Sequence, residues 1–97
     1  MKPKKPTCQT YANGDKVWYL NGKCHREDGP AIEHADGYKA WWLNGMLHRE
    51  DGPAIEYANG DKVWYLNGKR YYSEPDFYKQ LYKLGKITKE ELFIKLI

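Results

Sequence analysis

Cysteines, long apolar runs and an excess of one charge are all scarce in this sequence. The two cysteines, Cys8 and Cys24, are too few for a disulfide framework and too far apart for a zinc clip. No segment approaches the roughly 20 apolar residues of a membrane span, and no apolar signal region follows the first six residues. The formal net charge of +3 is too small to indicate a nucleic-acid-binding domain by itself. We therefore expect reduced thiols, no membrane span and a cytoplasmic protein.

The motifs of common enzymes are missing too. The sequence has no Gly-rich phosphate loop after a predicted strand, no nucleophile paired with a base, and no Cys/His pair at metal-ligand spacing. The one constellation that suggests acid–base chemistry is His-Arg-Glu-Asp, at residues 25–28 and again at residues 48–51. A catalytic group needs one tuned environment, so a histidine that recurs in register is more typical of a repeated packing role. We predict no enzyme activity, no catalytic residues, no bound metal and no cofactor.

What the sequence does contain is a repeat with a 23-residue period. The nine residues HREDGPAIE occupy residues 25–33 and again residues 48–56. A Trp, a Leu and an Asn-Gly pair precede each copy, and the same residues recur at 64–68, where Arg-Tyr-Tyr-Ser at 70–73 replaces the continuation. A fixed period of this length indicates one supersecondary unit stacked on copies of itself.

Six of the Asn-Gly and Asp-Gly pairs, those outside the two HREDGPAIE copies, divide the repeat region into short β-rich runs. They stand at residues 13–14, 21–22, 36–37, 44–45, 59–60 and 67–68. Each such pair supplies the two positive φ values that a type I′ hairpin turn needs. The pattern therefore predicts an antiparallel meander of hairpins.

A two-residue turn at every pair fixes which residues face each other. The predicted cross-strand pairs are Trp42/Leu47 and Trp41/His48 around residues 44–45, and Ile32/Trp41, Ala31/Trp42 and Glu33/Ala40 around residues 36–37. Because side chains alternate between faces, this register places large rings on both faces of the sheet. It also places each repeated His opposite a Trp, where the imidazole is expected to pack flat and donate to a carbonyl.

After residue 72 the period ends and helix signals begin. Residues 73–76 combine a Ser N-cap, a Pro in the first turn and an Asp, and Gly85 supplies a stop. Residues 88–91 have the capping-box spacing for a second helix. We expect the two helices to cap the open edge of the last repeat. The LFIKLI stretch at residues 92–97 is more apolar than a cap needs, which keeps open a partner-binding or dimer surface.

The repeat resembles the MORN repeat, a 23-residue hairpin motif of an aromatic residue, Asn-Gly-Lys, a spacer and His. The pattern is matched at residues 18–25, at residues 41–48 with Met46 in place of Lys, and at residues 64–71 with Tyr71 in place of His. After the His, where that family has a glycine, this chain has Arg-Glu-Asp-Gly-Pro. The HREDGPA-type variant is similar to small repeat proteins of bacteriophages and large DNA viruses and to MORN-like antitoxins of bacteria.

The resemblance implies a single-layer, twisted antiparallel sheet that acts in protein–protein contact. The predicted fold is therefore mainly β with a small α cap: a meander of three 23-residue hairpin repeats followed by two short C-terminal helices. The predicted divisions are a basic tail over residues 1–6, a MORN-like repeat β-sheet over residues 7–72 and a helical cap over residues 73–97.

The expected function is that of a small non-enzymatic protein-binding module. The resemblance suggests a viral or phage inhibitor that binds and occludes a host enzyme or defence component in the host cytoplasm. Two alternatives stay open: an antitoxin-like neutraliser of a partner toxin, and a single-stranded nucleic-acid-binding protein that combines Trp and Tyr rows with lysines. Another protein is the favoured partner and nucleic acid the less favoured one. A second copy of this chain, through the sheet face or the C-terminal helices, is a further candidate.

The candidate binding residues are side chains with the large contact area that interface anchors favour. They are Tyr19, Trp42, Tyr65, Arg49, Phe93 and Ile97. We expect alanine variants of Trp42 and Tyr65 to lose the partner and keep the fold.

Overall fold

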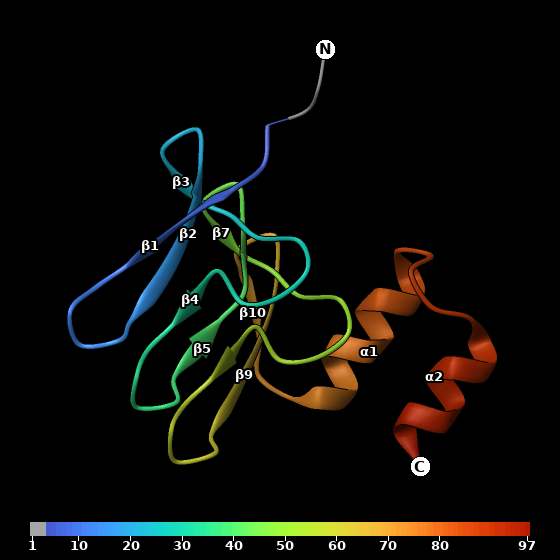
Figure 1. Cartoon of the computed structure of the whole chain (residues 1–97). Helices are drawn as coiled ribbons and strands as arrows, with labels where there is room; N and C mark the ends of the chain where they lie inside the picture. Colours follow the sequence, from blue (N-terminus) through green and yellow to red (C-terminus); the bar gives the residue numbers. More distant parts are fainter. Residues whose placement is uncertain (1–3) are drawn as a thin grey trace.

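The computed structural model describes residues 4–97 and consists of antiparallel strands followed by two helices (Figure 1). The strands are β1 (Thr7–Thr10), β2 (Lys16–Leu20), β3 (Lys23–Cys24), β4 (Ile32–Glu33), β5 (Lys39–Ala40), β6 (Trp42–Leu43), β7 (Met46–Leu47), β8 (Ile55–Glu56), β9 (Lys62–Leu66) and β10 (Lys69–Tyr71). The helices are α1 (Glu74–Lys83) and α2 (Lys89–Leu96). The predicted fold class, mainly β with a small α cap, is confirmed. The first three residues of the predicted basic tail lie outside the described residues.

The strands form a thin molecule with principal extents of 43 × 41 × 19 Å. Eight strands form one sheet in the order β1-β2-β4-β5-β8-β9-β10, with β3 paired to β2, and β6 pairs with β7 beside it. Backbone bonds connect the hairpins: the Arg26 N–H donates to the Trp42 carbonyl at 3.1 Å, and the Arg49 N–H donates to the Tyr65 carbonyl at 3.2 Å. Each hairpin is thus bonded to the next along the chain.

The Asn-Gly and Asp-Gly pairs make two different kinds of turn. After Leu, each Asn has a φ of 50 to 52° and each Gly a φ of 76 to 80°, as in a two-residue type I′ turn. After Ala, only the Gly has a positive φ, of 94 to 104°. There the loop has three residues, as the bond from the His34 N–H to the Tyr38 carbonyl shows.

This difference confirms one half of the predicted register and corrects the other. Trp42 lies opposite Leu47, as predicted for the turn at residues 44–45. Around residues 36–37 the pairs are Ile32 with Ala40 and Glu33 with Lys39. The predicted pairs Ile32/Trp41, Ala31/Trp42 and Glu33/Ala40 are wrong by one residue, because the loop holds three residues instead of two. A shift of one residue moves side chains to the opposite face.

The observed register sorts the strand residues into two faces, each named here after its largest rings. The tyrosine face carries Tyr11, Val17, Tyr19, Ile32, Tyr38, Ala40, Trp42, Ile55, Tyr57, Val63 and Tyr65. The tryptophan face carries Lys16, Trp18, Ala31, Glu33, Lys39, Trp41, Ala54, Glu56, Lys62 and Trp64. On the tryptophan face, lysines and glutamates alternate from β2 to β9, so each has an opposite charge as its cross-strand neighbour. This row favours the observed register.

The helices lie at the β9 and β10 end of the sheet, with α1 against the strands and α2 on the outer side of α1 (Figure 1). Phe77 and Leu81 of α1 are fully buried and form a core cluster with Leu66 and Tyr78. The half-buried side chains around this cluster are Trp64, Tyr71, Ile87 and Leu92. Since Leu66 shares a face with Trp64, α1 covers the tryptophan face of the last hairpin.

The predicted helix ends are confirmed. The Ser73 hydroxyl accepts a hydrogen bond from the Asp76 N–H at 3.2 Å, and Gly85 follows α1 with a φ of 73°. At α2, the Thr88 hydroxyl accepts from the Glu91 N–H at 3.1 Å, and the Glu91 carboxylate accepts from the Thr88 N–H at 3.0 Å. These caps depend on residues three apart, which is why the sequence indicates them well.

Candidate functional site

Each repeated histidine joins one hairpin to the next. The Nδ1 atom of His25 accepts a hydrogen bond from the Asn44 N–H at 3.0 Å, and the Nδ1 of His48 accepts from the Asn67 N–H at 2.9 Å. The backbone of His48 lies opposite Trp41, as predicted, with a bond from the His48 N–H to the Trp41 carbonyl at 3.0 Å. The prediction that the imidazole donates to a carbonyl is wrong, because Nδ1 is an acceptor here.

An accepting Nδ1 assigns the proton of each neutral imidazole to Nε2. The Nε2 of His48 lies 3.1 Å from the Glu50 carboxylate, and the Nε2 of His25 lies 3.7 Å from the Glu27 carboxylate. Both ring nitrogens therefore have a neighbour in the fold. The repeated His connects a hairpin, its own loop and the turn of the following hairpin.

The repeated arginine folds back over the tryptophan of its own hairpin. The Arg49 guanidinium lies 3.8 Å from the centroid of the Trp41 ring. It donates to the Asp51 carboxylate at 2.9 Å, the Pro53 carbonyl at 3.0 Å and the Glu56 carboxylate at 3.0 Å. This arrangement satisfies several guanidinium donors while the flat face of the group stacks on the indole.

The first copy of the loop repeats this arrangement. The Arg26 guanidinium lies 3.9 Å from the Trp18 centroid and donates to the Asp28 carboxylate at 3.0 Å. The glycine in each loop leaves room for the arginine: a Cβ on Gly52 would lie 2.9 Å from the Arg49 Cζ, so a larger residue would displace the guanidinium. These contacts assign a role to most residues of HREDGP. The His accepts a hydrogen bond from the next turn, and the Arg stacks on the Trp of its own hairpin. The Asp carboxylate and the Pro carbonyl accept hydrogen bonds from that Arg, and the Gly leaves room for it.

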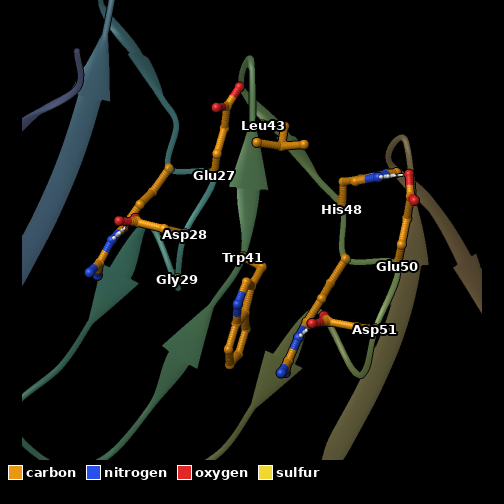
Figure 2. Close-up of a pocket in the computed structure, with 10 residues that line it drawn as sticks. Glu27, Asp28, Gly29, Trp41, Leu43, His48, Glu50 and Asp51 are labelled. Carbon is orange, nitrogen blue, oxygen red and sulfur yellow. Dashed lines mark hydrogen bonds and ion pairs between the residues drawn. The ribbon is translucent and has the colours of Figure 1, made fainter.

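A hollow of about 640 Å³ lies between the two loops on the tryptophan face (Figure 2). We call it the loop groove, and it is lined by residues 26–29, Trp41, Leu43 and residues 48–51. Figure 2 shows Trp41 between the two loops, with an aspartate on either side of it. The lining contains four carboxylates and two guanidinium groups, so the groove has a formal excess of two negative charges. Arg49 is the one predicted binding residue located here.

Three predicted binding residues, Tyr19, Trp42 and Tyr65, lie together on the tyrosine face. All three are half-buried. The indole N–H of Trp42 is buried without a hydrogen-bond partner among the described residues, so this ring is partly a packing element. The neighbouring Tyr11 side chain raises the pKa of Tyr19 above its ordinary value.

The tyrosine face has further rings that the sequence analysis missed. Tyr11 and Tyr57 are 41% and 44% exposed, and the Tyr38 and Tyr57 rings meet edge to face with centroids 5.5 Å apart. Burial raises the pKa of Tyr38. The sequence indicates these residues only by their position next to the Ala-Asn-Gly and Ala-Asp-Gly loops. A loop length of three residues is needed to assign them to the tyrosine face.

The last two predicted binding residues, Phe93 and Ile97, are remote in sequence from the strand residues and belong to the α2 segment. They are 65% and 84% exposed, and the neighbouring Ile94 is 65% exposed. No residue of α2 is fully buried. The structure therefore divides the predicted binding residues among three surfaces: the tyrosine face, the loop groove and the outer side of α2.

The strand lysines are separated from the tyrosine rings. Lys16, Lys39 and Lys62 lie on the tryptophan face, directly opposite Glu33 or Glu56 in the register. Their charges are therefore balanced across the strands. A surface that stacks bases and holds phosphates needs free rings and cations on the same face. The tryptophan face has both groups, but arginines stack on Trp18 and Trp41, and Trp64 packs against the α1 cluster.

Residues 4–97 contain neither a cluster of metal ligands nor a helix suited to cross a membrane. No group of three His, Cys, Asp or Glu side chains in this range has an arrangement that would hold a metal ion. Over the same residues, neither helix combines the length and the apolar character needed to cross a membrane. Cys8 and Cys24 are free thiols, and burial raises the pKa of Cys24.

Comparisons with known proteins add no relative: no family model, curated protein or solved structure matched this chain.

Proposed function

We propose that this protein is a small binding module that engages another protein through its tyrosine face and has no chemistry of its own. The supporting observation is the absence of a second layer over this face among the described residues. Helix α1 packs on Leu66 and Trp64, which belong to the opposite face of β9. The rings on this face are the exposed Tyr11 and Tyr57 and the half-buried Tyr19, Tyr38, Trp42 and Tyr65.

Such a face has the properties of a protein interface. Tyr and Trp rings supply large contact areas at a low cost in conformational entropy, and they are enriched at interface centres. Here the rings stand on short strands joined by tight turns, so their spacing is set before a partner arrives. Preorganisation of this kind lowers the entropy lost on binding.

The resemblance to phage and viral repeat proteins supports a more specific version of the proposal. In this version the protein acts in the host cytoplasm, where its tyrosine face occludes a host enzyme or defence component. An antitoxin-like protein that neutralises a toxin would use the same face in the same way. Single-stranded nucleic-acid binding has weaker support. The strand lysines lie on the tryptophan face, where each is opposite a glutamate and where arginines stack on the Trp18 and Trp41 rings.

Affinity purification from the natural host, followed by mass spectrometry, tests the proposal. We expect the wild-type chain to retain a stoichiometric partner and the double variant Tyr11→Ser and Tyr57→Ser to lose it. These exposed rings are cleaner probes than Trp42, whose truncation also removes packing. Tyr82→Ser is the matched control, because Tyr82 is 42% exposed and lies on α1, outside the sheet.

Two results would overturn the proposal. One is capture of the same partner by the double variant at wild-type yield. The other is salt-sensitive retardation of a single-stranded oligonucleotide that the tyrosine substitutions abolish, which would favour the nucleic-acid alternative.

A further inference from the structure

We infer that the loop groove is a second binding site, which accepts a segment rich in lysine and proline from a partner protein. This site lies on the tryptophan face. It is therefore separate from the tyrosine face and does not rest on the proposed function.

The repeat creates three equivalent positions on the tryptophan face. Each begins with a Trp and a Leu two residues later, followed by a His or Tyr. The three sets are Trp18, Leu20 and His25; Trp41, Leu43 and His48; and Trp64, Leu66 and Tyr71. The structure shows what lies on the first and the third.

The chain itself places a segment beyond the repeat at each of the two outer positions. At the third, the buried side chains of Phe77 and Leu81 pack with Leu66, Trp64 and Tyr71. At the first, residues 4–6, Lys-Lys-Pro, form one wall of a hollow of about 570 Å³, which Trp18, Leu20 and the acidic residues Glu27 and Asp28 also line. The middle position has only strand residues and the two loops around it among the described residues, which leaves the hollow of about 640 Å³ open.

The charge of the surrounding loops indicates whether the middle position resembles the first position, lined by residues 4–6, or the third, covered by α1. The amphipathic helix α1 lies at the third position, where Ser73 and Glu74 stand in the repeat register in place of Glu50 and Asp51, so this position has one full acidic loop instead of two. The middle position has an acidic loop on both sides, and it shares the loop at residues 26–29 with the position that residues 4–6 line. A lysine-containing segment therefore fits the middle position better than an apolar helix does.

The rim carboxylates are available to an incoming ammonium group. The side chain of Glu27 is 82% exposed, and its one ion-pair neighbour among residues 4–97 is the His25 ring, at 3.7 Å. Glu50 already has an ammonium neighbour from within the chain, since the Lys86 Nζ lies 3.8 Å from its carboxylate. Both carboxylates thus have capacity for a further basic partner.

The floor of the groove suits proline. Trp41 and Leu43 provide a half-buried aromatic and aliphatic surface, and proline-rich segments in the polyproline II conformation dock in aromatic-lined grooves of this kind. Such segments are already extended, so they lose little entropy on binding. In the first hollow, Pro6 is likewise half-buried beside Trp18.

The test is a titration of the full chain with a fluorescein-labelled peptide of the sequence KPKKPT, which copies residues 2–7. Anisotropy at low salt should show saturable binding, and the acidic analogue EPEEPT should not bind. We expect Glu50→Lys to weaken binding of KPKKPT at least about tenfold. Glu90→Lys is the matched control, because it makes the same charge change on α2 and should leave the affinity unchanged.

A second variant is needed because Glu50→Lys also removes the carboxylate beside the His48 ring. Glu27→Lys, at a more exposed rim position, should weaken binding in the same way, with circular dichroism confirming that both variants are folded. Equal affinity of the Glu50→Lys and Glu90→Lys proteins would overturn the inference, as would equal binding of the acidic peptide or no saturable binding up to about 1 mM peptide. The Tyr11 and Tyr57 variants should bind KPKKPT normally, so this inference and the proposed function fail independently.

Discussion

Trp41 and Trp64 occupy the same position in successive repeats but are covered in different ways. The guanidinium of Arg49 stacks on Trp41 at 3.8 Å and is held by three polar partners. Trp64 lies against a cluster that contains the fully buried Phe77 and Leu81 of α1. One ring therefore has a charged, solvent-contacting cover, and the other has an apolar cover.

The comparison shows what a thin repeat sheet needs. Within the sheet, an arginine is enough to cover each indole, and the cover also forms the wall of a groove. After the last repeat no further loop arrives, and Phe77 stands at the position where Ala31 and Ala54 stand in the HREDGPA copies. The chain turns into a helix there and builds the one cluster of fully buried large side chains among the described residues.

The largest effect is expected from removing a side chain of the apolar cluster that covers Trp64. Phe77→Ala removes a fully buried ring, and we expect it to lower the free energy of unfolding by about 3–5 kcal/mol. A domain of this size has little stability to spare. Urea denaturation followed by circular dichroism measures the loss. Phe93→Ala is the control, since Phe93 is 65% exposed, and an equal loss in that variant would contradict the assignment of the core.

The next largest effect is expected at the histidine that joins the first two hairpins. His25→Ala leaves the Asn44 N–H without its acceptor, and we expect a cost of roughly 1–3 kcal/mol in unfolding free energy. Faster hydrogen exchange at the Asn44 amide would locate the loss. His34→Ala, at an exposed position, should cost far less. Unchanged stability in His25→Ala would show that the bond contributes nothing.

The charged cover is tested by a substitution that keeps its charge. Arg49→Lys loses the flat stacking surface and the forked donors, and we expect a cost of about 1–2 kcal/mol. The same change at Arg26 should cost less, because Arg26 is 3.7 Å from Glu33, whereas Arg49 is 3.0 Å from Glu56. Paired urea denaturation curves measure both. Equal costs would mean that the stacking, and not the glutamate contact, dominates.

The smallest effect concerns a carboxylate that connects two turns. The Ala35 N–H donates to Asp15 at 2.7 Å and the Asn13 amide donates at 3.0 Å, and these bonds lower the pKa of Asp15 below its ordinary value. Its contribution to stability is therefore present above the ordinary pKa and is lost as the pH falls through the lowered one. A carbon-detected NMR titration measures this pKa. A value at or above the ordinary one would contradict the role of the Ala35 bond.

The predictable parts of the fold rest on short-range signals. Ser73 and Thr88 cap helices through residues three positions away, and the turn at residues 44–45 sets the pairing of Trp42 with Leu47. The turn at residues 36–37 was predicted with the wrong length, because Asp-Gly suits both a two-residue turn and a three-residue loop. One residue of loop length then decided which face carries Ala31 and which carries Ile32.

The candidate sites were less predictable from the sequence. Tyr19, Trp42 and Tyr65 were proposed together and do share a face, but Tyr57 was missed because its place depends on the length of its loop. Arg49 was proposed as a binding residue without its stacking on Trp41, which arises only when the loop folds back. Phe93 and Ile97 were proposed because the segment is apolar, and their exposure depends on how α2 packs on α1.

The sequence by itself determined the 23-residue period, the hairpins and the helix caps, because each depends on residues within one turn or one repeat. The tertiary structure alone decided the partners of the repeated residues. The Nδ1 of His25 finds the amide of a residue 19 positions away, and Trp41 and Trp64 receive different covers although the residues around them are similar. These outcomes depend on which hairpin or helix stands next in space, and only the packed sheet determines that neighbour.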